Sequence, residues 1–590
     1  MKEFLQQVAS TIVGILLFFI VVGAVGIMSI IGMIASSAAT QNVEENTVLV
    51  LNLNGTINEQ SNSNELDRFM GEENSTTGLN DILSAIRKAK NEDNIKGIYI
   101  EAGGLQTNYA TLQEIRNALA DFKKSGKWIV SYADSYSQGA YYVASVANKI
   151  YINPQGMLDW HGIASQPIFY RDLMAKFGIK YQIVKVGTFK SATETFTEDH
   201  MSDANRLQVK TFIDGTWQNI CSAVSQSRGI NVDKLNTFAD NMMEFQPTDQ
   251  LVKNRFVDGI MYADNVKKEV KKLLKLDDDD AINQLSVSDM INIKDNSNNG
   301  DAIAIYYASG DIIQNGSDEM FNSGQNIVGK DVCKDLEALM NDDDVKAVVI
   351  RVNSGGGDAF ASEQIWHQVN LLKQKKPVVI SMGDYAASGA YYMSAGASWI
   401  VAQPNTLTGS IGIFAAIPDL SGLVTQKLGV KFDEVKTNRH SAFGNYMARP
   451  FNEEERAYLQ AYVNRGYQLF TKRVADGRHM SIANVDKIAQ GRVWLATDAK
   501  KIGLVDQLGG LDDAVKKAAQ LAKLSEYYTS DYSKSRSWLS SILAPMSNGN
   551  NLDEQLRLAL GDLYSPFELI RNLNNREALQ ARMPYVVNIK

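Results

Sequence analysis

Short apolar runs alternate with longer amphipathic stretches through most of the chain, and this alternation predicts strands and helices in turn. In the first half the expected elements, in chain order, are a strand at 47–53, a strand at 97–100, a helix at 111–124, a strand at 128–132, a helix at 140–147 and a strand at 149–152. In the second half they are strands at 302–307, 347–352 and 378–381, and helices near 362–373 and 390–397. Short strands that alternate with helices are typical of parallel βαβ units whose helices cover both faces of a sheet. The pattern therefore predicts an α/β fold.

The two halves of the chain match one another at an offset of 250 residues. The segment DSYSQGAYY at Asp134–Tyr142 corresponds to DYAASGAYY at Asp384–Tyr392. The offset holds over more than 100 residues, as far as two long helices that Ser202 and Asn452 are expected to cap. A constant offset of this extent indicates two tandem repeats of one fold.

These patterns divide the chain into four parts. The 590 residues are too many for one core, so two domains of roughly 250 residues are expected. The parts are an N-terminal anchor at 1–46, a first repeat at 47–290, a second repeat at 291–530 and a C-terminal extension at 531–590. In the extension we expect a loop at 533–551 and a helical segment from 552 that ends in an extended tail at 583–589. The sequence assigns the extension no chemistry.

Residues 12–35 carry no charge over 24 positions, which is long enough to cross a bilayer core of roughly 30 Å as a helix. A cleaved signal peptide is the alternative, but its apolar region is usually about 7–15 residues long. A retained transmembrane helix at about 12–35 is therefore favoured. Lys2 precedes the span, and Glu44 and Glu45 follow it, which mildly favours a body on the outer side of the membrane.

Composition excludes several classes of function. The net charge of −8 comes without any basic tract and argues against nucleic-acid binding. The two cysteines form no CxxC pair, and no set of residues has the spacing of metal ligands. No nucleotide-binding lysine motif is present either, so no metal and no cofactor is expected.

A glycine triplet follows the buried strand at 347–352. Gly355, Gly356 and Gly357 can adopt positive φ angles and expose backbone N–H groups, which could bind a phosphate or the oxyanion of a tetrahedral intermediate. A tight turn is the alternative. The first repeat has Gly103-Gly104-Leu105 near this position, so the fold itself does not require the triplet.

Ser388 stands among small residues where a strand passes into a helix, and it is a candidate nucleophile. The alternative is that Ser388 only caps the helix. Gln138 at the matching position of the first repeat shows that a serine is not needed for the helix to begin. The small-residue turn at 407–412 is likewise replaced, in the first repeat, by the bulkier segment 157–162.

A nucleophilic serine needs a base, and the repeat singles out Lys190. Lys190 lies opposite His440 at the 250-residue offset, just as Gln138 lies opposite Ser388. If Lys190 is buried, desolvation lowers the pKa of its amine, which can then act as a neutral base near pH 7. A solvated lysine is the alternative for any single lysine. Because each repeat contributes one member of the pair, we expect a site at the seam between the two halves.

Four segments carry a resemblance to a known family. They are the glycine loop at 351–357, Ala-Ala-Ser-Gly at 386–389, Thr-Gly-Ser-Ile-Gly at 408–412 and Phe-Lys-Ser-Ala at 189–192. In their order along the chain and in their spacing they resemble the long form of the bacterial signal peptide peptidase (SppA) family, over roughly residues 1–530. The family carries proline where Gly355 stands and a small residue where Asp358 stands. At Asp358 an extra carboxylate close to the site is therefore expected.

The resemblance implies tandem Clp/crotonase-like domains and a Ser/Lys dyad, with Ser388 as nucleophile and Lys190 as general base. It implies an oxyanion hole at Gly356 and Gly357, with Ser410 beside the amine as a hydrogen-bond partner. It further implies a homotetramer on the outer, periplasmic side of the bacterial inner membrane.

On this basis the chain is expected to be a membrane-anchored serine endopeptidase that cleaves released signal peptides and similar short apolar peptides. Two alternatives stay open, a crotonase-type acyl-CoA enzyme and a non-catalytic membrane scaffold.

Overall fold

The computed structural model of the chain describes residues 18, 42–61, 78–291, 293, 300–315, 326–532 and 579–583. The expected transmembrane helix at 12–35 therefore lies outside the described residues, apart from Phe18, and so does the expected loop at 533–551. Across the parts of the chain that are described, no helix is both long and apolar enough to cross a membrane.

The first repeat forms a parallel sheet in the order β6-β4-β3-β2-β1-β7. Its strands are β1 (Thr47–Gly55), β2 (Ile95–Leu105), β3 (Trp128–Ala133), β4 (Lys149–Ile152), β6 (Gly259–Ile260) and β7 (Gln284–Leu285). Buried residues fill both faces, with Ile98 and Ile100 on one face and Val48 and Val130 on the other, as expected for a parallel sheet.

The second repeat forms an eight-stranded sheet in which the order β17-β15-β13-β11-β8-β19 is extended by β14 beside β13 and β18 beside β14. Its strands are β8 (Asp301–Ser309), β11 (Val345–Ser354), β13 (Val378–Ala387), β14 (Trp399–Ala402), β15 (Leu407–Gly409), β17 (Val493–Leu495), β18 (Gln507–Leu508) and β19 (Tyr527–Tyr532). Each strand expected from the sequence is present, and the prediction of two tandem α/β repeats is confirmed.

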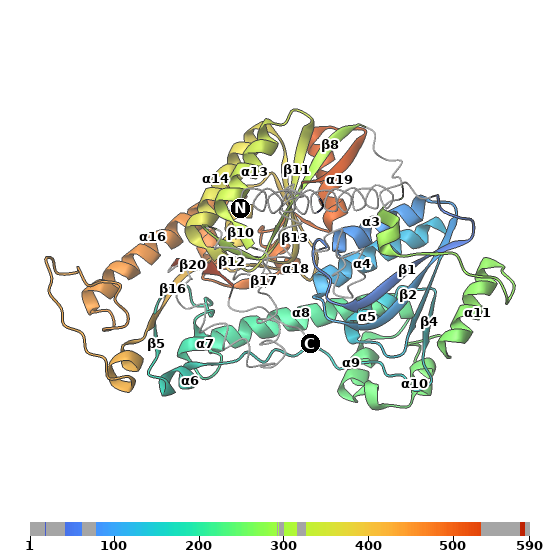
Figure 1. Cartoon of the computed structure of the whole chain (residues 1–590), viewed down its shortest axis with the longest axis horizontal. Helices are drawn as coiled ribbons and strands as arrows, with labels where there is room; N and C mark the ends of the chain where they lie inside the picture. Colours follow the sequence, from blue (N-terminus) through green and yellow to red (C-terminus); the bar gives the residue numbers. More distant parts are fainter. Residues whose placement is uncertain are drawn as a thin grey trace, which may run out of the picture.

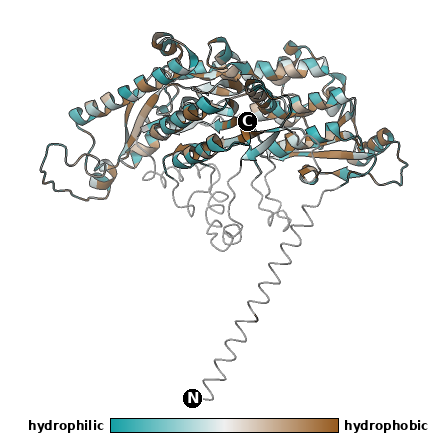
Figure 2. Cartoon of the chain, turned by 90° about the horizontal axis from the view of Figure 1, so that it is seen from above, coloured by the Kyte–Doolittle hydropathy of each residue, from teal (hydrophilic) through white to brown (hydrophobic). Residues whose placement is uncertain are grey.

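Helices lie around the sheets of the molecule (Figure 1). In the first repeat they are α3 (Leu79–Asn91), α4 (Tyr109–Phe122), α5 (Gln138–Ala144), α6 (Arg171–Lys176), α7 (Glu194–Thr197), α8 (Asp203–Arg228), α9 (Val232–Asp240), α10 (Thr248–Lys253), α11 (Ala263–Leu274) and α12 (Val287–Ile291). In the second they are α13 (Gly329–Asn341), α14 (Ala359–Lys375), α15 (Gly389–Ser394), α16 (Glu453–Arg478), α17 (Ile482–Ile488), α18 (Ala496–Lys501) and α19 (Leu511–Ala522). Figure 2 shows that many of these helices carry polar and apolar residues on different sides, which is the pattern of a helix lying against a core.

A third sheet joins the two repeats, in the order β10-β9-β12-β20-β16-β5. Its strands are β5 (Lys180–Val186), β9 (Asp311–Ile313), β10 (Asn326–Val328), β12 (Gly356–Asp358), β16 (Ile413–Asp419) and β20 (Leu579–Arg582). Strand β5 belongs to the first repeat, and all seven of its residues pair antiparallel with β16 of the second. This pairing carries the segment after β5 into the second repeat.

The expectation of a helix through residue 582 is wrong at its end, because Leu579–Arg582 form strand β20. This short segment pairs on one side with β12 and on the other with β16. Two strand edges are available to it there, and their hydrogen bonds replace those that a helix would supply.

The caps of the two long helices are as predicted. The Ser202 side chain accepts a hydrogen bond from the Asn205 N–H at the start of α8. Asn452 and Glu455 form a reciprocal capping box at the start of α16. Helix α8 runs from the first repeat along the underside of the second in the view of Figure 1.

A buried ion-pair network also joins the repeats. The Arg351 guanidinium, fully buried, donates to Glu59 Oε2 at 2.8 Å and to Glu114 Oε2 at 2.9 Å. Nearby, Asp384 accepts hydrogen bonds from the backbone N–H of Thr111 at 2.9 Å and from its hydroxyl at 2.7 Å. Both carboxylates that contact Arg351 come from the first repeat, so this network fixes how the two halves meet.

Candidate active site

The structure brings Ser388 and Lys190 together at the seam between the repeats. The Lys190 Nζ lies 2.7 Å from the Ser388 Oγ, and both side chains are fully buried. Lys190 follows β5 of the first repeat, whereas Ser388 lies between β13 and α15 of the second. The predicted meeting of these two residues is therefore observed, although they are 198 positions apart in the chain.

The backbone of Ser388 has φ 57° and ψ −115°, a conformation that L-residues rarely adopt. Its N–H donates to the Gly409 carbonyl at 2.8 Å, which helps to hold this turn. Its side chain makes no helix-capping hydrogen bond, so the alternative, a serine that only caps the helix, is not observed. In the first repeat, Ser137 caps α5, one position earlier in the aligned frame.

Burial is the main influence on Lys190. Desolvation lowers the pKa of its amine well below the ordinary value of 10.5, because the charged form loses its hydration. Besides Ser388, the Nζ lies 3.1 Å from the Ser410 carbonyl oxygen and 3.0 Å from the Ser410 Oγ. Ser410 itself has φ 51°, and its N–H donates to the Arg492 carbonyl at 2.7 Å. Ser410 thus lies beside the amine, as the resemblance implies.

Two glycines let the backbone close around Lys190. A Cβ on Gly491 would lie 2.6–2.7 Å from backbone and Cβ atoms of Lys190, and a Cβ on Gly412 would lie 3.2 Å from its Cδ. Gly491 also has φ 76°, where a side chain is strained. The sequence analysis did not single out Gly491, because nothing in its local sequence indicates which residue it approaches.

Helix α8 holds the segment that carries Lys190. The Gln208 amide donates to the Phe189 carbonyl at 3.1 Å and to the Ser191 Oγ at 2.9 Å, while its oxygen accepts from the Val493 N–H at 3.1 Å. Ser191 in turn donates to Asn205 at 2.9 Å. Gln208 therefore ties both neighbours of Lys190 to β17, and it too was missed by sequence analysis.

The glycine loop lies next to the turn that carries Ser388. Gly356 has φ 100°, and a Cβ there would lie 2.7 Å from the Gly389 backbone nitrogen. A Cβ on Gly389 would in turn lie 3.2 Å from the Gly357 nitrogen. The Gly356 N–H donates to the Ser354 Oγ at 3.1 Å. The Gly389 N–H, which follows the serine at the start of α15, is a further donor that sequence reasoning overlooked.

Asp358 has a local structural role in this loop. Its carboxylate caps α14 by accepting from the Ala361 N–H at 2.7 Å, and burial raises the pKa of that carboxyl. The carboxylate that the sequence analysis expected close to the site is thus engaged in the cap of α14.

The first repeat has filled the equivalent site. Gln138 is buried opposite Ser388; its amide donates to the Tyr109 hydroxyl at 2.8 Å, and its oxygen accepts from the Gly162 N–H at 3.0 Å. Trp160, opposite Ser410, is fully buried. In the first repeat, these larger side chains fill the space that corresponds to the one around Ser388 and Lys190 in the second repeat.

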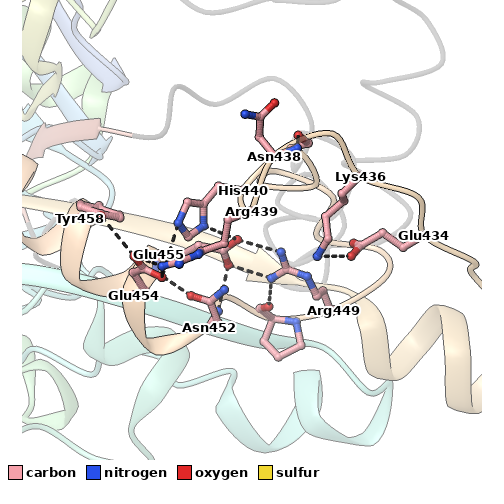
Figure 3. A network of polar contacts seen from close by, with 12 residues as sticks. Glu434, Lys436, Asn438, Arg439, His440, Arg449, Asn452, Glu454, Glu455 and Tyr458 are labelled. Carbon is pink, nitrogen blue, oxygen red and sulfur yellow. Dashed lines mark hydrogen bonds and ion pairs between the residues drawn. The ribbon is translucent and has the colours of Figure 1, made fainter.

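His440 takes no part in the site. Figure 3 shows it among charged residues near the start of α16. Its Nε2 lies 3.6 Å from the Glu454 carboxylate and its Nδ1 lies 3.7 Å from that of Glu455. Within the described residues, one group could offer three metal-ligand atoms, formed by Asp159, His161 and Glu244. This group belongs to the first repeat, and no site residue contributes to it.

Comparisons with known proteins agree with this architecture. The model of peptidase family S49 matches residues 121–277 and 370–525, and that of Clp protease matches residues 319–407. The chain is 34% identical to "Protease 4" of Salmonella typhi over 92% of this chain and 88% of the relative. It is 35% identical to "Protease 4" of Haemophilus influenzae, over 75% of this chain and 72% of the relative. It is 30% identical to "Serine protease SPPA, chloroplastic" of Arabidopsis thaliana, over 82% and 70%.

Two tandem α/β domains with a buried serine at their seam thus define a Clp-protease-like architecture. The chain belongs to peptidase family S49 and is a serine peptidase. The prediction of a serine peptidase is confirmed, and the acyl-CoA enzyme and the non-catalytic scaffold are set aside.

Proposed function

We propose that the chain is an endopeptidase in which Ser388 is the nucleophile and Lys190 the general base. The observation that carries this proposal is the 2.7 Å contact between a fully buried amine and a fully buried hydroxyl. Desolvation favours the neutral amine, which alone has a lone pair that can take the serine proton.

The surroundings of Lys190 suit a neutral amine. Such an amine has two N–H donors and one lone pair, whereas an ammonium has three donors and no acceptor. The Ser410 carbonyl and hydroxyl oxygens can accept the two N–H bonds. The lone pair then remains for the Ser388 O–H, which is the geometry from which a proton passes to the base.

The reaction would follow the usual course of acyl transfer. Ser388 Oγ attacks the scissile carbonyl while Lys190 takes its proton, and the oxyanion is held by backbone N–H groups of the loop at Gly356 and Gly357. The Gly356 N–H would exchange its bond to the Ser354 Oγ for one to the oxyanion. Lys190 then gives the proton to the leaving amine, and water clears the acyl-enzyme. The Gly389 N–H, adjacent to this loop, is an additional donor in the same place.

The proposed substrates are released signal peptides and similar short apolar peptides, bound as extended strands beside the site. The proposed setting is the outer face of the bacterial inner membrane, with residues 12–35 as a single transmembrane helix. That stretch is uncharged over 24 residues. We further propose a homotetramer, which the family resemblance implies.

Cleavage of a signal-sequence peptide by the wild type, Ser388→Ala, Lys190→Ala and the double variant tests the dyad. Residues that act as a unit lose activity together, so each single variant should lose about as much kcat as the double variant. Appreciable turnover by Lys190→Ala near pH 7 would contradict the assignment of the base. Circular dichroism of all four proteins controls for folding.

Membrane anchoring needs a separate measurement. The full chain should stay with the membrane pellet after an alkaline carbonate wash, and a chain lacking residues 1–41 should be released. Release of both proteins would contradict the anchor and leave the dyad untouched.

A further inference from the structure

The strand position beside the catalytic pair is occupied by the chain itself. Strand β20 lies between β12 and β16 and runs antiparallel to both. Gly356 is opposite Arg582 and Gly357 is opposite Ala581 on one side, while Phe414 is opposite Gln580 on the other. Strand β12 belongs to the glycine loop, and β16 begins three residues after Ser410. An extended peptide that approached Ser388 along these strands would need the place that β20 fills.

Ala581 presents its carbonyl group to the turn that carries Ser388. Its oxygen would lie 2.2 Å from a Cβ on Gly356 and 2.9 Å from a Cβ on Gly389. Gly389 directly follows Ser388, and Ala581 is fully buried. A carbonyl oxygen between the glycine loop and the residue after the nucleophile is where the reacting carbonyl of a substrate belongs.

The two residues that follow Ala581, Arg582 and Met583, also bind to the surrounding strands. The Met583 N–H donates to the Gly355 carbonyl at 2.6 Å, and its buried side chain belongs to an apolar cluster with Ala387 and Leu407. The Arg582 guanidinium forms an ion pair of 2.7 Å with Asp311 at the outer edge. Main-chain pairing, a buried apolar anchor and one charged contact are the means by which strand addition binds a peptide.

From this geometry we propose that residues 579–583 are a built-in competitor of the peptide substrate, with Ala581 in the position of the residue whose carbonyl Ser388 attacks. The proposal rests on the proposed function of the Ser388 and Lys190 pair. It extends that function in two ways: the site opens only when β20 leaves, and the acyl position of a substrate takes a small residue such as alanine. Because β20 is tethered, its effective concentration can reach the millimolar range. Even weak binding then keeps the site occupied.

Peptide binding to inactive protein tests occupancy without any need for turnover. The probe is a fluorescein-labelled peptide with the sequence of residues 577–585, followed by anisotropy. Three proteins carry Ser388→Ala, so that none can cut the tail: the full chain, a chain lacking 579–590 and a control lacking only 584–590. We expect the probe to bind at least about tenfold more tightly to the protein without 579–590 than to the other two. Equal affinity for all three, or no binding to any, would overturn the proposal.

A variant that keeps the chain length guards against a truncation that disturbs folding. In the full chain with Ser388→Ala, Ala581→Trp should also admit the probe, because the indole cannot fit the buried alanine position. A probe with tryptophan in place of Ala581 should bind none of the proteins. If this second probe bound as well as the first, the assignment of Ala581 to the acyl position would be overturned.

With Ser388 intact, the chain lacking 579–590 should show a lower KM for a signal-sequence peptide than the chain lacking 584–590, at similar kcat. An unchanged KM in the presence of measurable turnover overturns the competitor. Absence of turnover in every protein instead counts against the proposed function, and the anisotropy result still decides occupancy.

Discussion

Lys190 can reach Ser388 only because Gly491 has no side chain at the point where the chain passes closest to Lys190. At Gly491 the backbone of the second repeat lies against the backbone of Lys190, with no room for a side chain. A proton transfer that depends on a 2.7 Å contact is sensitive to such a displacement, since a misplacement of about 1 Å can cost on the order of a hundredfold in rate.

Gly491→Ala should therefore lower kcat by roughly a hundredfold, because the new Cβ pushes the Lys190 segment away from Ser388. Gly429→Ala is the matched control. Gly429 has nearly the same φ, 74° against 76°, but a Cβ there meets no atom within 4 Å. Both variants carry the backbone strain and only one has the contact, so equal kcat values would contradict the role of Gly491.

Residues such as Ser388 and Lys190 were open to prediction because the repeat provides an internal comparison. Gln138 and His440 show what the fold tolerates at the matching positions. The strained φ of Ser388 was not predictable, since serine has no preference for that conformation and the surrounding contacts impose it. The same holds for Gly491, whose partner is about 300 positions away in the chain.

At the scale of elements, α8 and β5 carry the lysine across the seam. Strand β5 pairs with β16 through all seven of its residues, and α8 ties the following segment to β17 through Gln208. Neither element would be expected to reach the second repeat from its local pattern. Strand pairing between residues more than 200 positions apart depends on which edges remain open once both sheets have formed.

Gln208→Leu should lower kcat at least about tenfold with a smaller change in KM, because the side chain positions Lys190 and does not touch substrate. Loss of its buried hydrogen bonds should also cost about 1–3 kcal/mol of stability. Gln218→Leu is the control on the same helix, where the exposed Gln218 amide donates to Ser222 one turn further on. If both variants kept wild-type kcat, α8 would have no positioning role.

The short strand β20 shows a different limit of sequence reasoning. Its four residues carry too weak a pattern to favour strand over helix. Only the open edges of β12 and β16, which come from elsewhere in the chain, decide its conformation. The regular strands of both sheets, in contrast, were predictable because their apolar runs and intervening helices recur twice.

At the scale of the whole molecule, the contact between Lys190 and Ser388 depends on the fixed arrangement of two repeats. The Arg351 pairs with Glu59 and Glu114 are buried in their interface, and removing one partner leaves carboxylates without a counter-charge in a low-dielectric region. The site at the seam is therefore coupled to the stability of the interface.

Arg351→Met should lower the free energy of unfolding by about 3–5 kcal/mol, measured by urea denaturation. Arg87→Met is the matched control, because Arg87 and Asp512 also form an ion pair between the repeats, at 3.4 Å, but both are exposed. The control should lose no more than about 1 kcal/mol. Equal losses in the two variants would mean that the buried network does not hold the halves together.

The most direct test of the account is the rate at which a fluorophosphonate probe labels Ser388 as a function of pH. In the proposed mechanism the neutral form of Lys190 is the reactive one, and burial lowers the pKa of this amine below its ordinary value. Labelling of the wild type should therefore rise with pH through one ionisation well below pH 10.5 and then level off. Lys190→Met should label only at a slow rate without that ionisation, and Ser388→Ala should not label at all. Wild-type labelling in Lys190→Met, or a rise only near pH 10.5, would contradict an uncharged Lys190 as the base.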